Sequence, residues 1–169
     1  GSMIFDRKYG VVYACISQRT DAVLIDKFNV LMDTESVVFH ALDKHGKEIY
    51  HTNVMMALGE DFVVICMESI AKEDSKIQLT KMFEKTGKEN NTITVKKKKK
   101  FAGNMLEVKN DNGERYLSMS QKAYDSLSKD QKQKLEAKTN LLPIAIPNIE
   151  KFGGGSVRCM MAEIFLPVK

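Results

Sequence analysis

Residues 54–95 read VMMALGEDFVVICMESIAKEDSKIQLTKMFEKTGKENNTITV and contain the pattern that decides the fold. Two apolar runs, Val54–Leu58 and Phe62–Cys66, flank a Gly-Glu-Asp turn, which predicts a β-hairpin. Apolar residues then recur three or four positions apart behind Asp74, which predicts a capped helix with one face on a core. A last run, Ile93–Val95, predicts a third strand. The unit is therefore strand, strand, helix, strand.

The stretch before this unit has the same order. Met3–Phe5 and Val11–Ile16 predict a hairpin, and Val37–Phe39 predicts the third strand. Thr20 or Asp21 can cap a helix between them, because their side-chain oxygens accept hydrogen bonds from free helix N–H groups. The apolar residues of this helix, which we expect to face the core, are Val23, Leu24, Phe28 and Leu31.

The stretch after residue 103 repeats the order once more. Met105–Val108 and Tyr116–Met119 flank a turn rich in Asn, Asp and Gly and predict a hairpin. Ser120 can cap a helix, and Ser128 can begin a further turn or two. Leu141–Ile146 predicts the closing strand.

The spacing of the three hairpins indicates a repeat. They begin near residues 3, 54 and 105, so the period is about 51 residues, a length typical of a repeated supersecondary unit. The units resemble one another in pattern more than in letters. A chain of 169 residues fits one domain, and alternating strands and helices predict the α/β (α+β) class.

Composition excludes several classes of protein. Apolar residues make up 43% of the chain, enough for a core, and no run approaches the length of a transmembrane helix. The net charge is +4, and the longest charged block, Lys96–Lys100, has no interleaved aromatic residues. We therefore expect no membrane and no nucleic-acid partner, and we interpret the lysine run as a solvated face.

The three cysteines argue for a reducing compartment. Their number is odd and no CxxC pair occurs, so neither a disulfide framework nor a zinc knuckle is predicted. Cys15 and Cys66 lie in apolar runs and are expected to be buried. The histidines, His40, His45 and His51, are irregularly spaced, so we expect no metal and no other cofactor. A cytoplasmic location is the corresponding prediction.

Three segments could carry chemistry. His51 and Asn53 precede an apolar run, and on a strand residues two apart point the same way, so an imidazole and an amide could share one pocket. Cys159 follows a glycine run, Gly153–Gly155, and adjoins Arg158, a setting that could lower a thiol pKa and produce a nucleophile. Asn104 follows a small-Gly step and could point its amide into a pocket.

Each segment also has a purely structural interpretation. The histidine could end a strand and bond to a turn, and Cys159 could be an ordinary cysteine after a flexible loop. Asn104 could serve only to tolerate the backbone angles of a tight turn.

Taken together, these motifs resemble a known family. GGGSVRCMM at 153–161 is similar to the C-terminal nucleophile motif of arginine deiminases and amidinotransferases, the guanidino-modifying or pentein superfamily. The step from His51 to Asn53 resembles the catalytic His-x-Asp motif of that family, and Gly103–Leu106 resembles its Gly-Asn-(Asn)-Val-Leu strand. Residues 2–169 are most similar to a bacterial branch of citrulline-utilisation hydrolases or amidinotransferases.

The resemblance implies the pentein α/β-propeller, in which five strand-strand-helix-strand units surround one axis. Three units are expected here, at about residues 1–50, 51–103 and 104–169. The chain, residues 1–169, is then either a single domain or the C-terminal three-fifths of one pentein domain. A homo-oligomer or an N-terminal companion segment could supply the remainder.

The resemblance also implies the chemistry. Cys159 matches the nucleophile that attacks a guanidino or ureido carbon and forms a thiouronium-type intermediate, and His51 matches the acid/base. Asn53, Asn104 and Arg158 are the expected substrate contacts. Asn53 stands where the family has aspartate, which favours a neutral ureido substrate such as citrulline over arginine.

Two questions stay open at the level of sequence. The same Cys and His serve a hydrolase, which passes the group to water, and an amidinotransferase, which passes it to an amine. The alternative to both is a non-catalytic binding module with the pentein fold, or an inactive fragment, because the carboxylates that grip a guanidinium in the family lie mostly in its N-terminal units.

Overall fold

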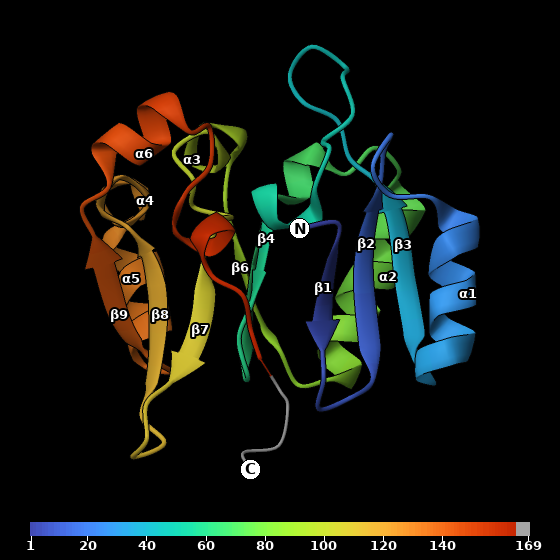
Figure 1. Ribbon diagram of the computed structural model, residues 1–169, viewed down its shortest axis with the longest axis horizontal. Coiled ribbons are helices and arrows are strands. Elements are labelled where there is room, and N and C mark those ends of the chain that lie inside the picture. The colour runs from blue at the N-terminus through green and yellow to red at the C-terminus, as the bar shows by residue number, and fades with distance from the viewer. Residues whose placement is uncertain (165–169) are drawn as a thin grey trace.

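The fold consists of three small sheets of the same construction (Figure 1). A computed structural model describes residues 1–164. In each sheet the first two strands pair antiparallel and the second and third pair parallel. The strands are β1 (Met3–Asp6), β2 (Val11–Ile16), β3 (Glu35–His40), β4 (Met56–Leu58), β5 (Phe62–Ile65), β6 (Glu89–Thr92), β7 (Leu106–Lys109), β8 (Arg115–Ser120) and β9 (Asn140–Ile144).

Helices connect the parallel strands of each sheet, so the strand-strand-helix-strand order is confirmed three times. The helices are α1 (Ala22–Met32), α2 (Glu73–Lys85), α3 (Val95–Lys98), α4 (Gln121–Ser126), α5 (Lys129–Glu136) and α6 (Pro147–Phe152), with short 3-10 helices at Thr52–Val54, Met67–Ser69 and Val157–Met160. Three predicted caps are confirmed, since Asp21, Ser120 and Ser128 accept hydrogen bonds from backbone N–H groups of α1, α4 and α5.

Two elements of the middle unit differ from the prediction. The third strand is β6, four polar residues, and not Ile93–Val95. Glu89–Thr92 forms a strand because its backbone pairs with β5. Val95 instead begins α3, which Thr94 caps by accepting a hydrogen bond from the Lys97 N–H. The predicted cap of α2 was also wrong, because the helix begins at Glu73, one residue before Asp74, and has no side-chain cap.

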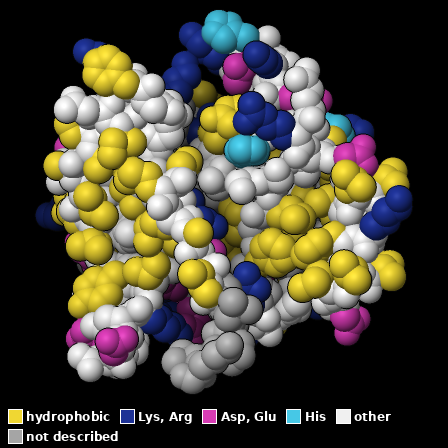
Figure 2. All heavy atoms as spheres, viewed as in Figure 1, with side chains coloured by type: hydrophobic (Ala, Val, Ile, Leu, Met, Phe, Trp, Pro, Cys, Tyr) yellow, Lys and Arg dark blue, Asp and Glu magenta, His cyan; other side chains and the backbone are white. Residues whose placement is uncertain are grey.

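The outward face of α1 is a third correction. Val23, Leu24 and Leu31 were expected on a core, yet they are 61%, 62% and 81% exposed. Within α1 only Ile25 is buried. The helix lies at the outer edge of the molecule beside β3 (Figure 1), and apolar side chains gather over this side of the surface (Figure 2). The spacing of apolar residues correctly predicts that α1 has an apolar face, but no other part of the described chain packs on that face.

The first strands of the three units meet around one cavity. It has a volume of about 340 Å³ and is lined mainly by β1, β4 and β7 with the segments that follow them. At its rim a buried ion pair joins the first two units, with Lys88 Nζ 3.0 Å from Asp6 Oδ2. The two side chains are 1% and 4% exposed, and Lys88 also donates to the Glu60 carbonyl at 2.6 Å.

Candidate active site

Cys159 lies in the 3-10 helix Val157–Met160, directly after the glycine run. Gly154 has a φ of +69°, a left-handed conformation that favours glycine. Gly155 lies against the thiol, since a Cβ added there would be 3.2 Å from Cys159 Sγ. The glycines therefore let the backbone fold back onto an exposed, free thiol, while Cys15 and Cys66 are buried as predicted.

Asn104 contacts that thiol. Its Nδ2 lies 3.3 Å from Cys159 Sγ and donates to the Asn53 carbonyl at 3.0 Å. The side chain is only 3% exposed. Asn104 also ends a turn, because its N–H donates to the Phe101 carbonyl at 2.8 Å. The two interpretations of this segment thus hold together: the turn exists, and it aims the amide at the cysteine.

Asn53 joins this pair through its carbonyl, and it and His51 lie on a different element from the one predicted. They do not share a strand, because the chain turns into the 3-10 helix Thr52–Val54 immediately after His51. Both side chains nevertheless converge, since a Cβ added to Gly1 would lie 2.8 Å from His51 Nδ1 and 3.2 Å from Asn53 Oδ1. Asn53 Oδ1 is buried and has no hydrogen-bond partner among the described residues.

The electrostatic surroundings of His51 favour the neutral imidazole. Its pKa lies below the ordinary value, first because the ring is partly buried, then because of the Gly1 ammonium, and then because of Arg19. The Arg19 guanidinium stacks 5.3 Å from the centre of the Tyr50 ring, which in turn lies 4.9 Å from the His51 ring. Sequence reasoning missed Arg19, because its loop carries no motif.

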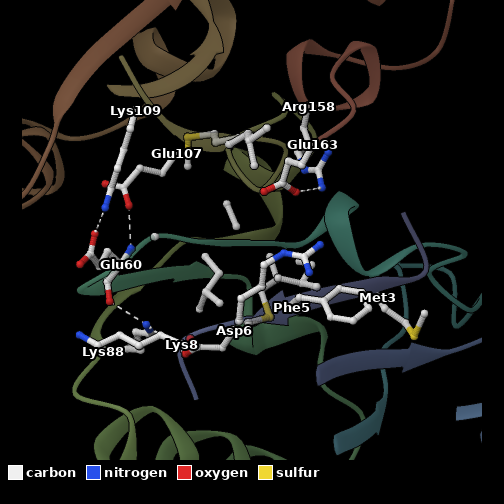
Figure 3. A pocket seen from close by; sticks show the side chains of 18 residues that line it. Met3, Phe5, Asp6, Lys8, Glu60, Lys88, Glu107, Lys109, Arg158 and Glu163 are labelled. Carbon is white, nitrogen blue, oxygen red and sulfur yellow. Dashed lines mark hydrogen bonds and ion pairs between the residues drawn. The ribbon is translucent and has the colours of Figure 1, made fainter. Parts of the chain in front are cut away.

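Arg158 does not line the Cys159 cavity. Its guanidinium lies 3.1 Å from Glu163 and donates to the Met161 carbonyl at 3.1 Å. Figure 3 shows this pair in the cavity between the first strands, apart from the cluster of Glu60, Lys88 and Lys109. The structure thus places Asn104 against Cys159 and against the Asn53 carbonyl. His51 and the Asn53 side chain lie around Gly1, whose ammonium both Arg158 and Cys159 influence. Arg158 itself pairs with Glu163.

A small cavity adjoins the cysteine. Its volume is about 170 Å³, and its lining residues are Tyr50, Val54, Lys98, Lys99, Phe101, Asn104, Gly154, Gly155, Ser156 and Cys159. The interpretation of the lysine run as a solvated face was wrong for Lys98, which is 7% exposed. The cap at Thr94 starts a short helix and turns this one lysine inward, which a uniform run of letters does not reveal.

Residues 1–164 hold neither a candidate metal cluster nor a membrane-spanning helix. No group of three or more His, Cys, Asp and Glu side chains in this range is placed to hold a metal ion. Among the same residues, no helix is long and apolar enough to cross a bilayer.

Comparison with known proteins identifies the family. Residues 1–166 match the family model of the eukaryotic N,N dimethylarginine dimethylhydrolases, and the chain belongs to this family. It therefore lies in the guanidino-modifying, or pentein, superfamily that its motifs resemble. The search of curated protein sequences finds no match.

Solved structures show the same fold at low identity. The N-terminal domain of ArgZ, an arginine dihydrolase from Cyanobacteria, was solved as a substituted form covalently bound to a reaction intermediate. It matches with a TM-score of 0.73 and 20% identity over 95% of this chain and 53% of that one. AgrE in complex with ornithine and NAD+ matches with a TM-score of 0.76 and 16% identity, over 100% of this chain and 23% of that one. SxtG, an amidinotransferase from Microseira wollei, matches with a TM-score of 0.63 and 11% identity, over 94% of this chain and 42% of that one. The chain thus spans about half the length of the ArgZ domain.

Proposed function

We propose that this chain carries the nucleophile half of an enzyme that breaks C–N bonds at a guanidino or ureido carbon. The observation that carries the proposal is the contact between Cys159 and Asn104, which also donates to the Asn53 carbonyl. His51 lies against Gly1, whose ammonium Cys159 influences. Family membership supports it, and so does the covalent intermediate held by the ArgZ domain. Exposure of the thiol supports it further, because a nucleophile must reach its substrate.

In the proposed reaction the Cys159 thiol passes its proton to the neutral His51 imidazole, and the thiolate attacks the planar carbon to form a tetrahedral adduct. The C–N bond to the leaving group breaks, and His51 donates the proton that the departing nitrogen needs. This leaves a thiouronium-type intermediate on sulfur. Water then attacks the same carbon, His51 accepts its proton, and the C–S bond breaks to return the thiolate. Asn104 holds the sulfur in place through its Nδ2 group.

Two observations bear on the substrate class, and they point to different compounds. The family name points to methylated arginine, and its hydrolysis would release an alkylamine and leave citrulline. Asn53 offers an unpaired amide oxygen where the family motif has a carboxylate, which favours a neutral ureido group over a cationic guanidinium. Transfer to an amine in place of water is the other outcome, as in an amidinotransferase such as SxtG.

We further propose that the three units work as part of a five-unit pentein domain. The chain spans about half of the ArgZ domain, and the apolar face of α1 is uncovered. The added units would supply the carboxylates that grip a guanidinium, from a companion segment or an oligomer. Free cysteines fit a cytoplasmic protein.

The decisive experiment measures amine and ammonia release from N,N-dimethylarginine, arginine and citrulline. It compares the 169-residue chain with a preparation that adds the remaining repeats. We expect turnover in the longer form, with loss by a factor of at least about 10³ in Cys159→Ala and His51→Ala. His45→Ala, at an exposed loop histidine, is the matched control and should retain activity. Absence of turnover in the longer form on all three compounds would favour the binding module.

A further inference from the structure

The serine that begins the 3-10 helix of Cys159 does not cap it. Ser156 occupies the N-cap position of Val157–Met160, where a serine oxygen ordinarily accepts a hydrogen bond from a helix N–H group. Its side chain makes no such bond. Ser156 Oγ instead donates to Glu150 Oε1 at 2.8 Å, and the two residues are 0% and 9% exposed. A buried carboxylate on α6 therefore takes the hydroxyl that would otherwise serve the helix.

This hydrogen bond closes a loop that is otherwise free to vary. It joins residues six positions apart, and the three glycines at 153–155 lie between them. Glycine loses more conformational freedom on folding than any other residue, so such a loop has no fixed shape of its own. A hydrogen bond to a carboxylate is roughly twice as strong as one between neutral groups. The bond between Glu150 and Ser156 therefore fixes the end of the loop against α6.

Ser156 in turn connects to the thiol. Its carbonyl accepts from the Cys159 N–H at 3.0 Å, and Cys159 Sγ lies 3.3 Å from Asn104 Nδ2. A displacement of Ser156 thus moves the sulfur away from the amide that holds it. Glu150 acts at a distance, because it lines a separate cavity of about 640 Å³ beside α4 and α6. The wall next to Cys159, in the described residues, includes Ser156 but not Glu150.

Resting on the proposed function, we infer that Glu150 is a positioning residue for the nucleophile. It holds the Ser156 hydroxyl, and Ser156 holds the start of the 3-10 helix. The sulfur of Cys159 is thereby kept against Asn104. Attack on a planar carbon depends on such placement, since misplacing a reacting atom by about 1 Å can cost about 10²-fold in rate. The role needs a hydrogen-bond acceptor at position 150, which glutamine keeps and alanine removes.

The first test measures hydrogen exchange of the Cys159 amide by NMR, in the 169-residue chain and without substrate. This N–H donates to Ser156, so its exchange reports whether the start of the helix is fixed. We expect exchange to accelerate about tenfold in Glu150→Ala and in Ser156→Ala, and to stay within about twofold of the natural rate in Glu150→Gln. Lys151→Ala, at the next and exposed position of α6, is the matched control and should leave the rate unchanged.

The second test asks whether Glu150 controls the contact between sulfur and amide. An N–H donor stabilises negative charge on sulfur, so Asn104→Leu should slow alkylation of Cys159 by iodoacetamide about tenfold. In the Glu150→Ala background the same substitution should change the rate by less than about twofold, because the contact is already lost. In the Glu150→Gln background the full effect should return. A purely structural role for Glu150 would leave the effect of Asn104→Leu the same in all three backgrounds.

Labelling at Cys15 and Cys66 monitors folding, because both thiols are buried in the folded chain. If Glu150→Ala exposes them, Ser156→Ala takes its place in both tests. Unchanged exchange in the folded variant overturns the inference. An equal effect of Asn104→Leu with and without Glu150 does so too, as does failure of Glu150→Gln to restore that effect.

The result is separable from the proposed function, because neither test needs turnover. Both effects together with no turnover in any form would leave the positioning role standing and sink the enzyme. Turnover in the longer form without either effect would do the reverse.

Discussion

The helices α1 and α2 occupy the same place in consecutive repeats and have opposite surroundings. A shift of 51 positions brings Leu31 and Met32 level with Met82 and Phe83. The first two are 81% and 52% exposed, and the second two are 8% and 1% exposed. Helix α2 packs on the sheet of the preceding unit, where the Phe83 and Tyr13 rings lie 5.4 Å apart. Helix α1 has no preceding unit in the described residues. The difference shows that α2 is buried because the sheet of the preceding unit lies against it.

The largest expected effect breaks the packed helix. Phe83→Ala should lower the free energy of unfolding by about 3–5 kcal/mol, because it removes a buried ring and leaves a cavity. Met32→Ala, at the equivalent position of α1, should change it by less than about 0.5 kcal/mol. Urea unfolding followed by circular dichroism measures both. An equally large loss in Met32→Ala would mean that another chain covers the face of α1 in solution.

The next effect concerns association. An uncovered apolar face promotes contact between molecules, so the average mass of the natural chain should rise with concentration. Leu31→Glu should shift the midpoint of association to about tenfold higher concentration, because pairing the face would then bury a charge. Ile77→Glu, at a 46% exposed position of α2, is the control. Analytical ultracentrifugation gives both midpoints, and equal midpoints for the two variants would rule out α1 as the contact.

The start of each helix sharpens the comparison further. Asp21 Oδ1 accepts from the Leu24 N–H at 3.1 Å, whereas Lys72 makes no such bond at the start of α2. Asp21→Ala should therefore cost about 1 kcal/mol, and Lys72→Ala close to nothing. With little tertiary packing, α1 depends on its cap more than α2 does. Hydrogen exchange of the first-turn amides should accelerate in Asp21→Ala alone, and acceleration in both would argue against this dependence.

The smallest expected effect is a change in the pKa of His51, and it arises in the loop that leads into α1. Arg19 stands before α1 where the next repeat has Ile70. Arg19 is the third cause, after burial and the Gly1 ammonium, of the lowered pKa of His51. Arg19→Ile should raise that pKa towards its ordinary value, seen by NMR titration of the ring protons.

The linked effect on stability has a definite sign. Because the folded pKa of His51 is the lower one, its contribution is fully present above the unfolded value of 6.5 and is lost as pH falls through the folded value. Arg19→Ile should reduce this loss on acidification. A pKa that stays unchanged, or falls, in the variant would remove Arg19 from the list of causes.

The sequence predicted the parts of the fold that depend on local chemistry. Apolar runs located the strands of residues 1–164 closely, with β6 as the exception, and Asp21, Ser120 and Ser128 were readable caps. Strand β6 was not predictable in place, because Glu89–Thr92 is polar and is a strand only through its pairing with β5. The exposure of α1 depends on what lies beside it, which no periodicity records.

The site divides in the same way. The convergence of Asn104 and Cys159, which lie 55 positions apart, was suggested by family motifs and not by spacing. His51 and Asn53 were expected to converge through strand geometry, and they converge through a 3-10 turn. The burial of Lys98 and the engagement of Arg158 with Glu163 depend on tertiary placement, so a lysine run and an Arg-Cys step could not reveal them.

The pair of Asp6 and Lys88 has a consequence for how this sequence can change over time. Removing either charge alone leaves the other buried and uncompensated, at a cost of about 3–5 kcal/mol, a large part of the stability of a small domain. Replacing both with apolar residues of similar size is close to neutral. Natural selection should therefore remove single substitutions at either position and tolerate replacement of both residues together. In an alignment of relatives, positions 6 and 88 should covary, with acid and base lost or gained together.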